Sequence, residues 1–207
     1  MTELKLKKGT ALVVVAHPDD ETIWMGGTIL KHPQVSWTIF SLCRSDDEDR
    51  APRFRKVAEY FKAHGIISDL EDEHLMNIRE SIPEIEKRLV ARLPSTSFDY
   101  IFTHNRNGEY GHIRHKGVHR AMSRLLSSSR LKANDVFYFC YEMAGNGKMG
   151  KPNKSKADLA VGLDKKTYDK KLHIIQDPGL YNFRPDIFES LSCHSVETFC
   201  KAKSFNK

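Results

Sequence analysis

Unbroken apolar runs and amphipathic stretches alternate along the chain. Residues 11–16, Ala-Leu-Val-Val-Val-Ala, are apolar throughout and β-branched in the middle, which is typical of a strand buried on both faces of a parallel sheet. Similar runs predict strands at 35–43, 98–103 and 135–140. A helical pattern follows the first strand over about 20–31, with carboxylates at its start that suit the positive end of the helix dipole.

Three more helices are predicted between and after these strands. Pro52 opens one that ends at Gly65, a second spans about 82–93, and a third spans 115–126. Strands that alternate with helices of ten to fifteen residues indicate βαβ units. The predicted fold class is α/β, a Rossmann-like three-layer sandwich with a mostly parallel central sheet. A chain of 207 residues is short for two domains, so we expect residues 1–207 to form a single domain.

The first predicted strand ends in an acidic segment. No G-x-G-x-x-G follows it, which removes the usual reason to expect a dinucleotide site; His-Pro-Asp-Asp-Glu at 17–21 follows instead. Ligand sites of open α/β sheets form at such strand ends, and an acidic cluster attracts a cation. The bend brings His17 and Asp20 close enough to share one metal ion. Taken alone, the segment is explained equally well by capping of the helix, which needs no metal.

A second predicted strand end carries histidines. Residues 104–115 contain His-Asn-Arg-Asn-Gly-Glu-Tyr-Gly-His-Ile-Arg-His. A lone H-x-x-H is weak evidence in a chain with ten histidines, but two histidine-bearing ends converge at one edge of a parallel sheet. His115 would then complete a His-Asp-His set with His17 and Asp20, while His112 stays unligated above the open fourth position.

The two segments together resemble the LmbE/PIG-L family of zinc-dependent N-acetylglucosaminyl deacetylases. Ala-His-Pro-Asp-Asp-Glu and Gly-x-Tyr-Gly-His-x-x-His carry the resemblance, which extends from about Ala11 to the C-terminus and thins after Tyr141. It implies one deacetylase domain that holds Zn²⁺, with Fe²⁺ as the other ion that such a site accepts. The metal ligands that it implies are His17, Asp20 and His115.

The resemblance also implies roles for four more residues. Asp19 would be the general base, and His112 would stabilise the oxyanion or protonate the leaving amine. Tyr110 would assist at the oxyanion, with half-buried packing as the alternative. Arg53, twelve residues before Gly65, stands where the family has an arginine that contacts substrate; the alternative is a surface charge at a helix start.

Two further positions bear on the resemblance. Arg114 stands where the family commonly has a carboxylate that pairs with the first histidine of the motif. A guanidinium beside His112 would favour neutral imidazole, so the acid role of His112 depends on where Arg114 points. Near the end of the chain, Glu197-Thr198-Phe199 resembles the closing helix of the family.

The net charge and the composition of the loops give little further information about function. The formal charge of +6 comes from 33 Lys+Arg against 27 Asp+Glu, which is explained by a solvated basic surface, with an anionic substrate or non-specific nucleic-acid contact as alternatives. Dispersed lysines and the lack of an RNP-like aromatic motif predict no specific nucleic-acid partner. The glycine- and lysine-rich stretch 144–156 is either a surface loop or a flap near the site.

The spacing of the cysteines and the length of the apolar segments indicate the cellular location of the protein. The four cysteines have no C-x-x-C spacing, which favours reduced thiols and a cytoplasmic location. Cys193, His194 and Cys200 would make a second metal site, although core packing is the commoner role. The apolar run at 11–16 is too short for a signal peptide, and no stretch is long enough to span a bilayer.

The function predicted from the sequence is hydrolysis of an N-acetyl group. The substrate class is a small N-acetylglucosamine-type amino sugar or glycoconjugate, attacked by a water that zinc activates. The alternatives are a catalytically silent metal-binding scaffold of the same fold and a basic nucleic-acid-binding α/β domain. Asp19 argues against the scaffold, which needs no base. The oligomeric state, including a homo-oligomer, is left open.

Overall fold

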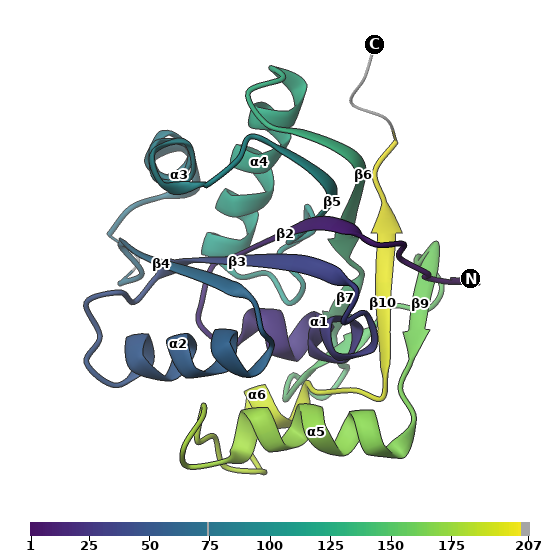
Figure 1. Cartoon of the computed structure of the whole chain (residues 1–207). Helices are drawn as coiled ribbons and strands as arrows, with labels where there is room; N and C mark the ends of the chain where they lie inside the picture. Colours follow the sequence, from purple (N-terminus) through teal and green to yellow (C-terminus); the bar gives the residue numbers. More distant parts are fainter. Residues whose placement is uncertain (74, 204–207) are drawn as a thin grey trace.

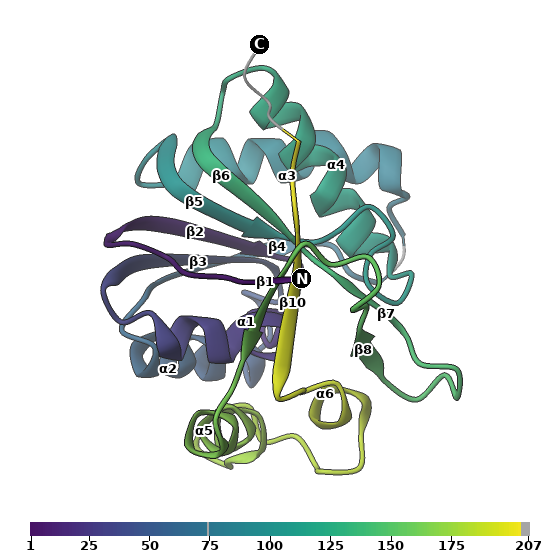
Figure 2. The same cartoon turned by 90° about the vertical axis from the view of Figure 1, so that its right-hand side faces the viewer.

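One large sheet with helices on both faces organises the protein. The computed structural model describes residues 1–73 and 75–203. Eight strands form the sheet in the order β1-β9-β10-β6-β5-β2-β3-β4, and Figures 1 and 2 show helices above and below it. The predicted three-layer α/β sandwich is confirmed. The strands of the sheet are β1 (Thr2–Glu3), β2 (Gly9–Val15), β3 (Val35–Cys43), β4 (His64–Leu70), β5 (Ser97–Thr103), β6 (Lys132–Phe139), β9 (Leu159–Gly162) and β10 (Val196–Lys201).

The remaining elements are six helices and a hairpin within the described residues. None of these helices is long and apolar enough to cross a membrane. The helices are α1 (Asp20–Lys31), α2 (Arg50–Tyr60), α3 (Ile78–Arg92), α4 (Ile113–Ser127), α5 (Lys165–Gln176) and α6 (Phe188–Leu191), and the hairpin pairs β7 (Tyr141–Met143) with β8 (Gly150–Pro152).

The strands that follow the predicted βαβ pattern are parallel. β4, β3, β2, β5 and β6 pair in parallel, and β10 runs antiparallel between β6 and β9. Val14 of β2 pairs with Thr103 of β5. The segments that follow these two strands, which carry His17 and the second group of histidines, therefore start side by side at one edge of the sheet.

Two apolar cores lie on the two faces of the sheet. Ala11, Val13 and Val15 of β2 pack in one core with α1, α2 and α5. Leu12 and Val14 pack in the other core with α3 and α4. Because neighbouring side chains of a strand point to opposite faces, burial on both sides requires the uninterrupted apolar run that the sequence shows.

Two sequence-based assignments are wrong. The helix predicted to end at Gly65 ends at Tyr60, and Gly65 lies in β4 instead. A Cβ at this position would lie 2.6 Å from the Cβ of Ala58, so the glycine allows β4 to approach α2 closely. The segment around Glu197, which resembles a closing helix, is strand β10.

Glu197 supports α1 from the neighbouring strand β10. The helix is kinked at Met25, and the amide groups of Gly27 and Thr28 beyond the kink donate to the Glu197 carboxylate at 2.8 and 2.7 Å. Lys171 of α5 also donates to this carboxylate at 2.7 Å, and both side chains of the pair are fully buried. The carboxylate thus satisfies the amide groups freed by the kink and joins α1, α5 and β10.

Candidate metal centre

A cavity of about 290 Å³ opens at the carboxyl ends of β2 and β5. This is the edge of the sheet at which the sequence predicts chemistry. Aromatic side chains from α1 and α6 line the cavity together with carboxylates and two arginines. The predicted site residues in its wall are His17, Asp19, Asp20 and Tyr110.

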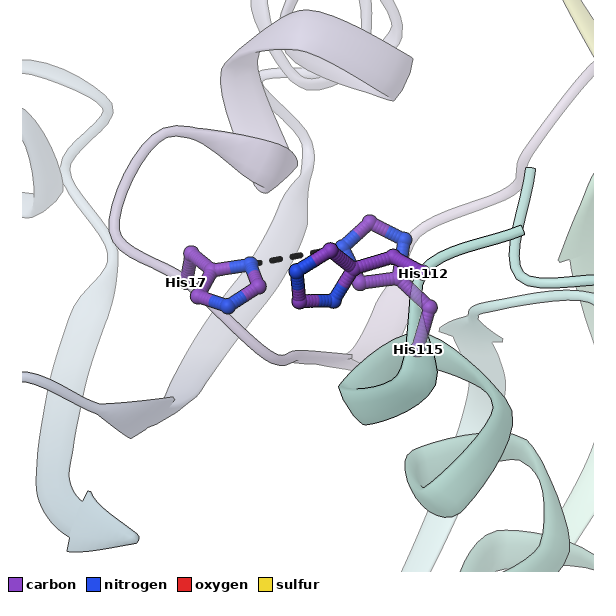
Figure 3. A group of neighbouring side chains, drawn as sticks. All are labelled: His17, His112 and His115. Atoms are coloured by element: carbon purple, nitrogen blue, oxygen red, sulfur yellow. Dashed lines mark hydrogen bonds between the residues drawn. The ribbon is translucent and has the colours of Figure 1, made fainter. Parts of the chain in front are cut away.

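Three of the predicted site residues direct one atom each at a common point. His17 Nδ1 lies 3.3 Å from Asp20 Oδ2, His115 Nε2 lies 3.4 Å from the same oxygen, and the two nitrogens are 3.3 Å apart. In Figure 3 a dashed line joins the imidazole ring of His17 to that of His115. Three ligands about 2.0–2.1 Å from a tetrahedral ion are separated by about 3.4 Å. The donor atoms therefore fit one zinc-sized ion without rearrangement.

Each of these histidines meets a carboxylate on its far side. His17 Nε2 lies 3.0 Å from Asp72 Oδ1, and His115 Nδ1 lies 2.6 Å from Glu109 Oε2. Arg44 in turn donates to the other oxygen of Asp72 at 2.8 Å. A carboxylate on one ring nitrogen keeps the proton there and leaves the other nitrogen as an acceptor, which is how metal-binding histidines are oriented.

The charges around the centre favour a cation. Burial alone lowers the pKa of His17, but its bonds to Asp20 and Asp72 and their charges raise this pKa to about 10. For Asp20, burial raises the pKa, and the neighbouring His115 and His104 outweigh it and hold the value well below the usual range. In the absence of a metal, the site thus holds protons where a divalent ion would supply the positive charge.

Glu109 and His104 are part of the site, although neither was assigned a role from the sequence. The same Glu109 oxygen that meets His115 also accepts from His104 Nδ1 at 2.7 Å, and all three side chains are fully buried. His104 Nε2 accepts the Ala16 amide at 3.0 Å, and its ring stacks on that of His115 at 3.8 Å. The position of His104 directly after β5 is the signal that could have identified it.

The chain bend at Asp19 favours the metal site over simple helix capping. Asp19 has φ 128°, in the left-handed region that non-glycine residues rarely adopt. In the described structure, its side chain makes no capping hydrogen bond to α1. Asp20 Oδ2 accepts the His17 amide at 2.9 Å, and Asp20 Oδ1 accepts from Trp24 Nε1 at 2.8 Å. The bend therefore holds the Asp20 carboxylate toward the centre.

Asp19 lies in the cavity wall beside the guanidinium group of Arg50. Its carboxylate accepts from Arg50 Nη1 at 3.1 Å, and the Arg50 guanidinium lies over the Phe183 ring at 4.4 Å. Burial and the charge of Asp20 hold the pKa of Asp19 well above its usual range, opposed by Arg50 and His17. A carboxylate with a raised pKa is a stronger base than an ordinary one, which favours a role as proton acceptor.

His112 and Tyr110 border the same point. His112 precedes α4, and its Nδ1 accepts the Arg114 amide at 3.3 Å. Its ring meets that of His17 edge-on, with the ring centroids 4.7 Å apart. Burial and the charges of His115 and His17 lower the pKa of His112 to about 3. Tyr110 packs edge-on against Phe188 at 4.6 Å and against His115 at 5.2 Å.

Arg53 does not line the cavity in the described structure. Its guanidinium donates to the carbonyl oxygens of Pro178 and Leu180 at 2.9 and 2.6 Å and to the Asp49 carboxylate at 2.7 Å. These bonds hold the start of α2 to the segment after α5. Arg50, one helical turn earlier, is the arginine of this helix that lines the cavity. The substrate contact of Arg53 stays a prediction.

Arg114 points away from the metal centre. Its guanidinium is completely buried and bonds to the Glu71 carboxylate and, at 2.7 Å, to the Met76 carbonyl. Glu71 also accepts the Met76 amide at 3.0 Å. Arg114 thus anchors the segment after β4, which carries Asp72, the carboxylate that orients His17. The guanidinium of Arg114 therefore has a structural role.

The other candidate features lie apart from the centre. Cys193, His194 and Cys200 do not form a metal-binding group among the described residues, and Cys193 packs in the apolar core instead. The stretch 144–156 forms the turn and second strand of the β7–β8 hairpin, with Gly150 packed closely on Trp24. Trp24 also donates to Asp20, so the packing of Gly150 on Trp24 helps to hold the Asp20 side chain in place.

Sequence comparison places both motifs in a known family. The family model described as GlcNAc-PI de-N-acetylase, PIG-L, matches residues 12–126. An uncharacterized protein of Acanthamoeba polyphaga mimivirus is 23% identical over 131 residues, which cover 56% of this chain. The match spans 57% of that curated relative, so little more than half of its length is compared.

Solved structures share the fold over most of the chain. The N,N'-diacetylchitobiose deacetylase of Pyrococcus horikoshii superposes with a TM-score of 0.65 at 16% identity, covering 93% of this chain and 83% of its own. The 4-carboxy-2-hydroxymuconate hydratase of Pseudomonas putida superposes with a TM-score of 0.60 at 14% identity, covering 94% and 96%. Since these two proteins carry out different reactions, the shared fold alone does not define the activity.

Proposed function

This chain belongs to the PIG-L family, because the family model matches more than half of its residues, and we propose that it is a metal-dependent N-deacetylase. The proposed reaction is hydrolysis of the acetyl amide of an N-acetylglucosamine-type sugar or conjugate. The observation that carries this proposal is the set of three donor atoms at 3.3–3.4 Å from one another, contributed by His17, Asp20 and His115. Each histidine of this set is oriented by its own carboxylate.

We assign Zn²⁺ as the cofactor, held by these three side chains. A zinc ion bound there would polarise the amide carbonyl and lower the pKa of a water in the open position. Two imidazoles and one carboxylate also suit Fe²⁺. Metal analysis of protein purified without added metal distinguishes the two ions.

Asp19 is the proposed proton acceptor of the reaction. It lies next to a ligand in sequence, and its carboxylate faces the cavity with Arg50 bonded to one oxygen. Arg50 thereby restricts the carboxylate to one orientation. Asp19 would take a proton from the attacking water and return it to the leaving amine.

His112 is the proposed donor to the oxyanion. Its Nδ1 accepts the Arg114 amide, so neutral His112 carries its proton on Nε2. A pKa lowered to about 3 keeps the ring neutral at pH 7, which favours hydrogen-bond donation over proton transfer. Tyr110, whose pKa is raised by burial and nearby carboxylates, stays a hydroxyl donor beside it.

The cavity supports a small substrate. A volume of about 290 Å³ lies just below the range of roughly 300–1,000 Å³ for ligand pockets. One sugar unit would enter, with Tyr110 and Phe188 as an apolar surface for its ring. Asp19, Asp20, Asp47, Asp72 and Glu189 line the cavity against two arginines, which disfavours a nucleic-acid backbone at this site.

A screen of N-acetylated amino sugars for released acetate and amine tests the proposal. The metal-loaded protein is compared with the chelator-treated protein and with Asp19→Asn, which alters the base and keeps the ligands. We expect acetate from at least one glucosamine derivative in the metal-loaded protein only. A catalytically silent scaffold would release none, and a hydratase of this fold would add water to an alkene substrate without releasing acetate.

A further inference from the structure

Two cysteine thiols meet where β10 runs beside the end of β6. In the register of these antiparallel strands, Phe199 faces Phe139 and Cys200 faces Tyr138, and the Cys140 amide donates to the Thr198 carbonyl at 2.8 Å. Cys140 and Cys200 are therefore diagonal neighbours across the two strands, which lie side by side in Figure 1. Their sulfur atoms are 2.7 Å apart.

The surroundings of the pair leave it accessible. Cys140 is buried, whereas Cys200 is partly exposed. Cys200 Sγ also lies 3.5 Å from the Lys156 carbonyl. The hydrogen bond between Cys200 and Cys140 lowers the pKa of the Cys200 thiol, against the effect of burial. Cys200 is thus the thiol of the pair that solvent reaches and that ionises more readily.

The other two cysteines differ in their environment. Cys43 packs in the core that contains α3 and α4, and Cys193 packs in the core on the other face of the sheet. Burial raises the pKa of both thiols. Contact between two sulfurs is thus a specific property of Cys140 and Cys200, and packing of small apolar side chains does not require it.

We infer that Cys140 and Cys200 are a redox modification site, at which a peroxide-class oxidant forms a reversible intrachain disulfide. The Cys200 thiolate attacks one oxygen of hydrogen peroxide and becomes a sulfenic acid, and the hydroxide that leaves becomes water on protonation. Cys140 then loses its proton and attacks that sulfur, so that the S–S bond forms and a second water leaves. Two thiols lose two electrons and two protons, and one peroxide becomes two waters.

The disulfide would fasten β10 to the centre of the sheet. It would join residues 60 positions apart and so restrict the unfolded chain. β10 carries Glu197, whose carboxylate holds the part of α1 beyond its kink. Oxidation would therefore keep Glu197 in place against α1, the helix that begins at Asp20. It would place no new group in the cavity.

Mass spectrometry of the full-length protein after peroxide treatment tests this inference. Free thiols are blocked, the protein is digested, and the melting temperature is recorded before and after addition of dithiothreitol. We expect a Cys140–Cys200 cross-link within one chain, reversed by the reductant, and a rise in Tm on the order of 5–10 °C. Cys200→Ser and Cys140→Ser should lose both effects, and Cys193→Ala should keep them.

Three results would overturn the inference. One is oxidation of Cys200 to sulfinic or sulfonic acid while Cys140 still reacts with the blocking reagent. Another is a cross-link that joins two chains. The third is a cross-link that dithiothreitol does not reverse, because the inferred disulfide is reversible. Cys200 is partly exposed, so Cys200→Ser is the variant that keeps the test valid if Cys140→Ser does not fold.

Discussion

Replacing Glu109 by glutamine should weaken metal binding without removing a ligand. Glu109 Oε2 accepts from the Nδ1 atoms of both His115 and His104, and Oε1 accepts the Asn105 amide at 2.8 Å. A glutamine has only one accepting oxygen, so either the two imidazoles or the Asn105 amide would face an NH₂ group. The proton on His115 Nδ1 would no longer be held, and Nε2 would lose part of its basicity.

The expected loss of metal affinity is about 10- to 100-fold, which is the usual effect of removing such an orienting partner. This corresponds to about 1.4–2.7 kcal/mol. One buried donor without an acceptor should also lower the free energy of unfolding by about 1–3 kcal/mol. The two effects are separable because zinc affinity is measured on folded protein.

Competition titration of zinc against a chromophoric chelator measures the affinity of the wild type and of Glu109→Gln. Glu86→Gln is the matched control, because Glu86 is also a buried carboxylate but pairs with Arg124 and Arg130. The control should lower stability and leave zinc affinity unchanged. A Glu109→Gln protein that is folded and binds zinc as tightly as the wild type would refute the orienting role.

Three further predictions concern individual side chains. Asp19→Asn should retain its metal while acetate release falls by about two to four orders of magnitude; a loss of metal would instead make Asp19 a ligand. Arg50→Ala should lower kcat, because the Asp19 carboxylate would lose its fixed orientation. Arg53→Ala should raise KM if Arg53 contacts substrate. If Arg53 only joins α2 to the segment after α5, kcat and KM should both stay unchanged. Burial lowers the pKa of His194 below its ordinary 6.5, so the unfolded chain takes up this proton first and the free energy of unfolding falls as pH drops below 6.5. Denaturant titrations across this range should show a smaller decline for His194→Gln.

The sequence was sufficient to predict four of the five strands that pair in parallel, namely β2, β3, β5 and β6, and missed β4. The apolar run of β2 is continuous because both faces of the strand are buried, and this pattern is visible without coordinates. The same argument placed the two histidine-bearing segments together, since the ends of β2 and β5 are neighbours. Family membership, predicted from the two motifs, is confirmed by the family match over residues 12–126.

The parts that the sequence did not predict depend on contacts between distant residues. Gly65 resembles a helix stop, and only its contact with Ala58 explains a glycine within β4. Glu197 lies in a strand and braces a helix that precedes it by about 170 positions. Asp72 and Glu109 are ordinary acidic residues until the fold places them against imidazole nitrogens. Local patterns carry no information about such partners.

A metal titration of acetate release tests the central claim most directly. The protein is stripped with a chelator and then receives zinc in increments, and acetate from an N-acetylglucosamine derivative is measured together with bound metal. We expect acetate release to rise until one ion is bound per chain, and His17→Ala, Asp20→Ala and His115→Ala each to lose the bound ion. Undiminished acetate release by the metal-free protein, or full metal retention in any of the three variants, would contradict the account.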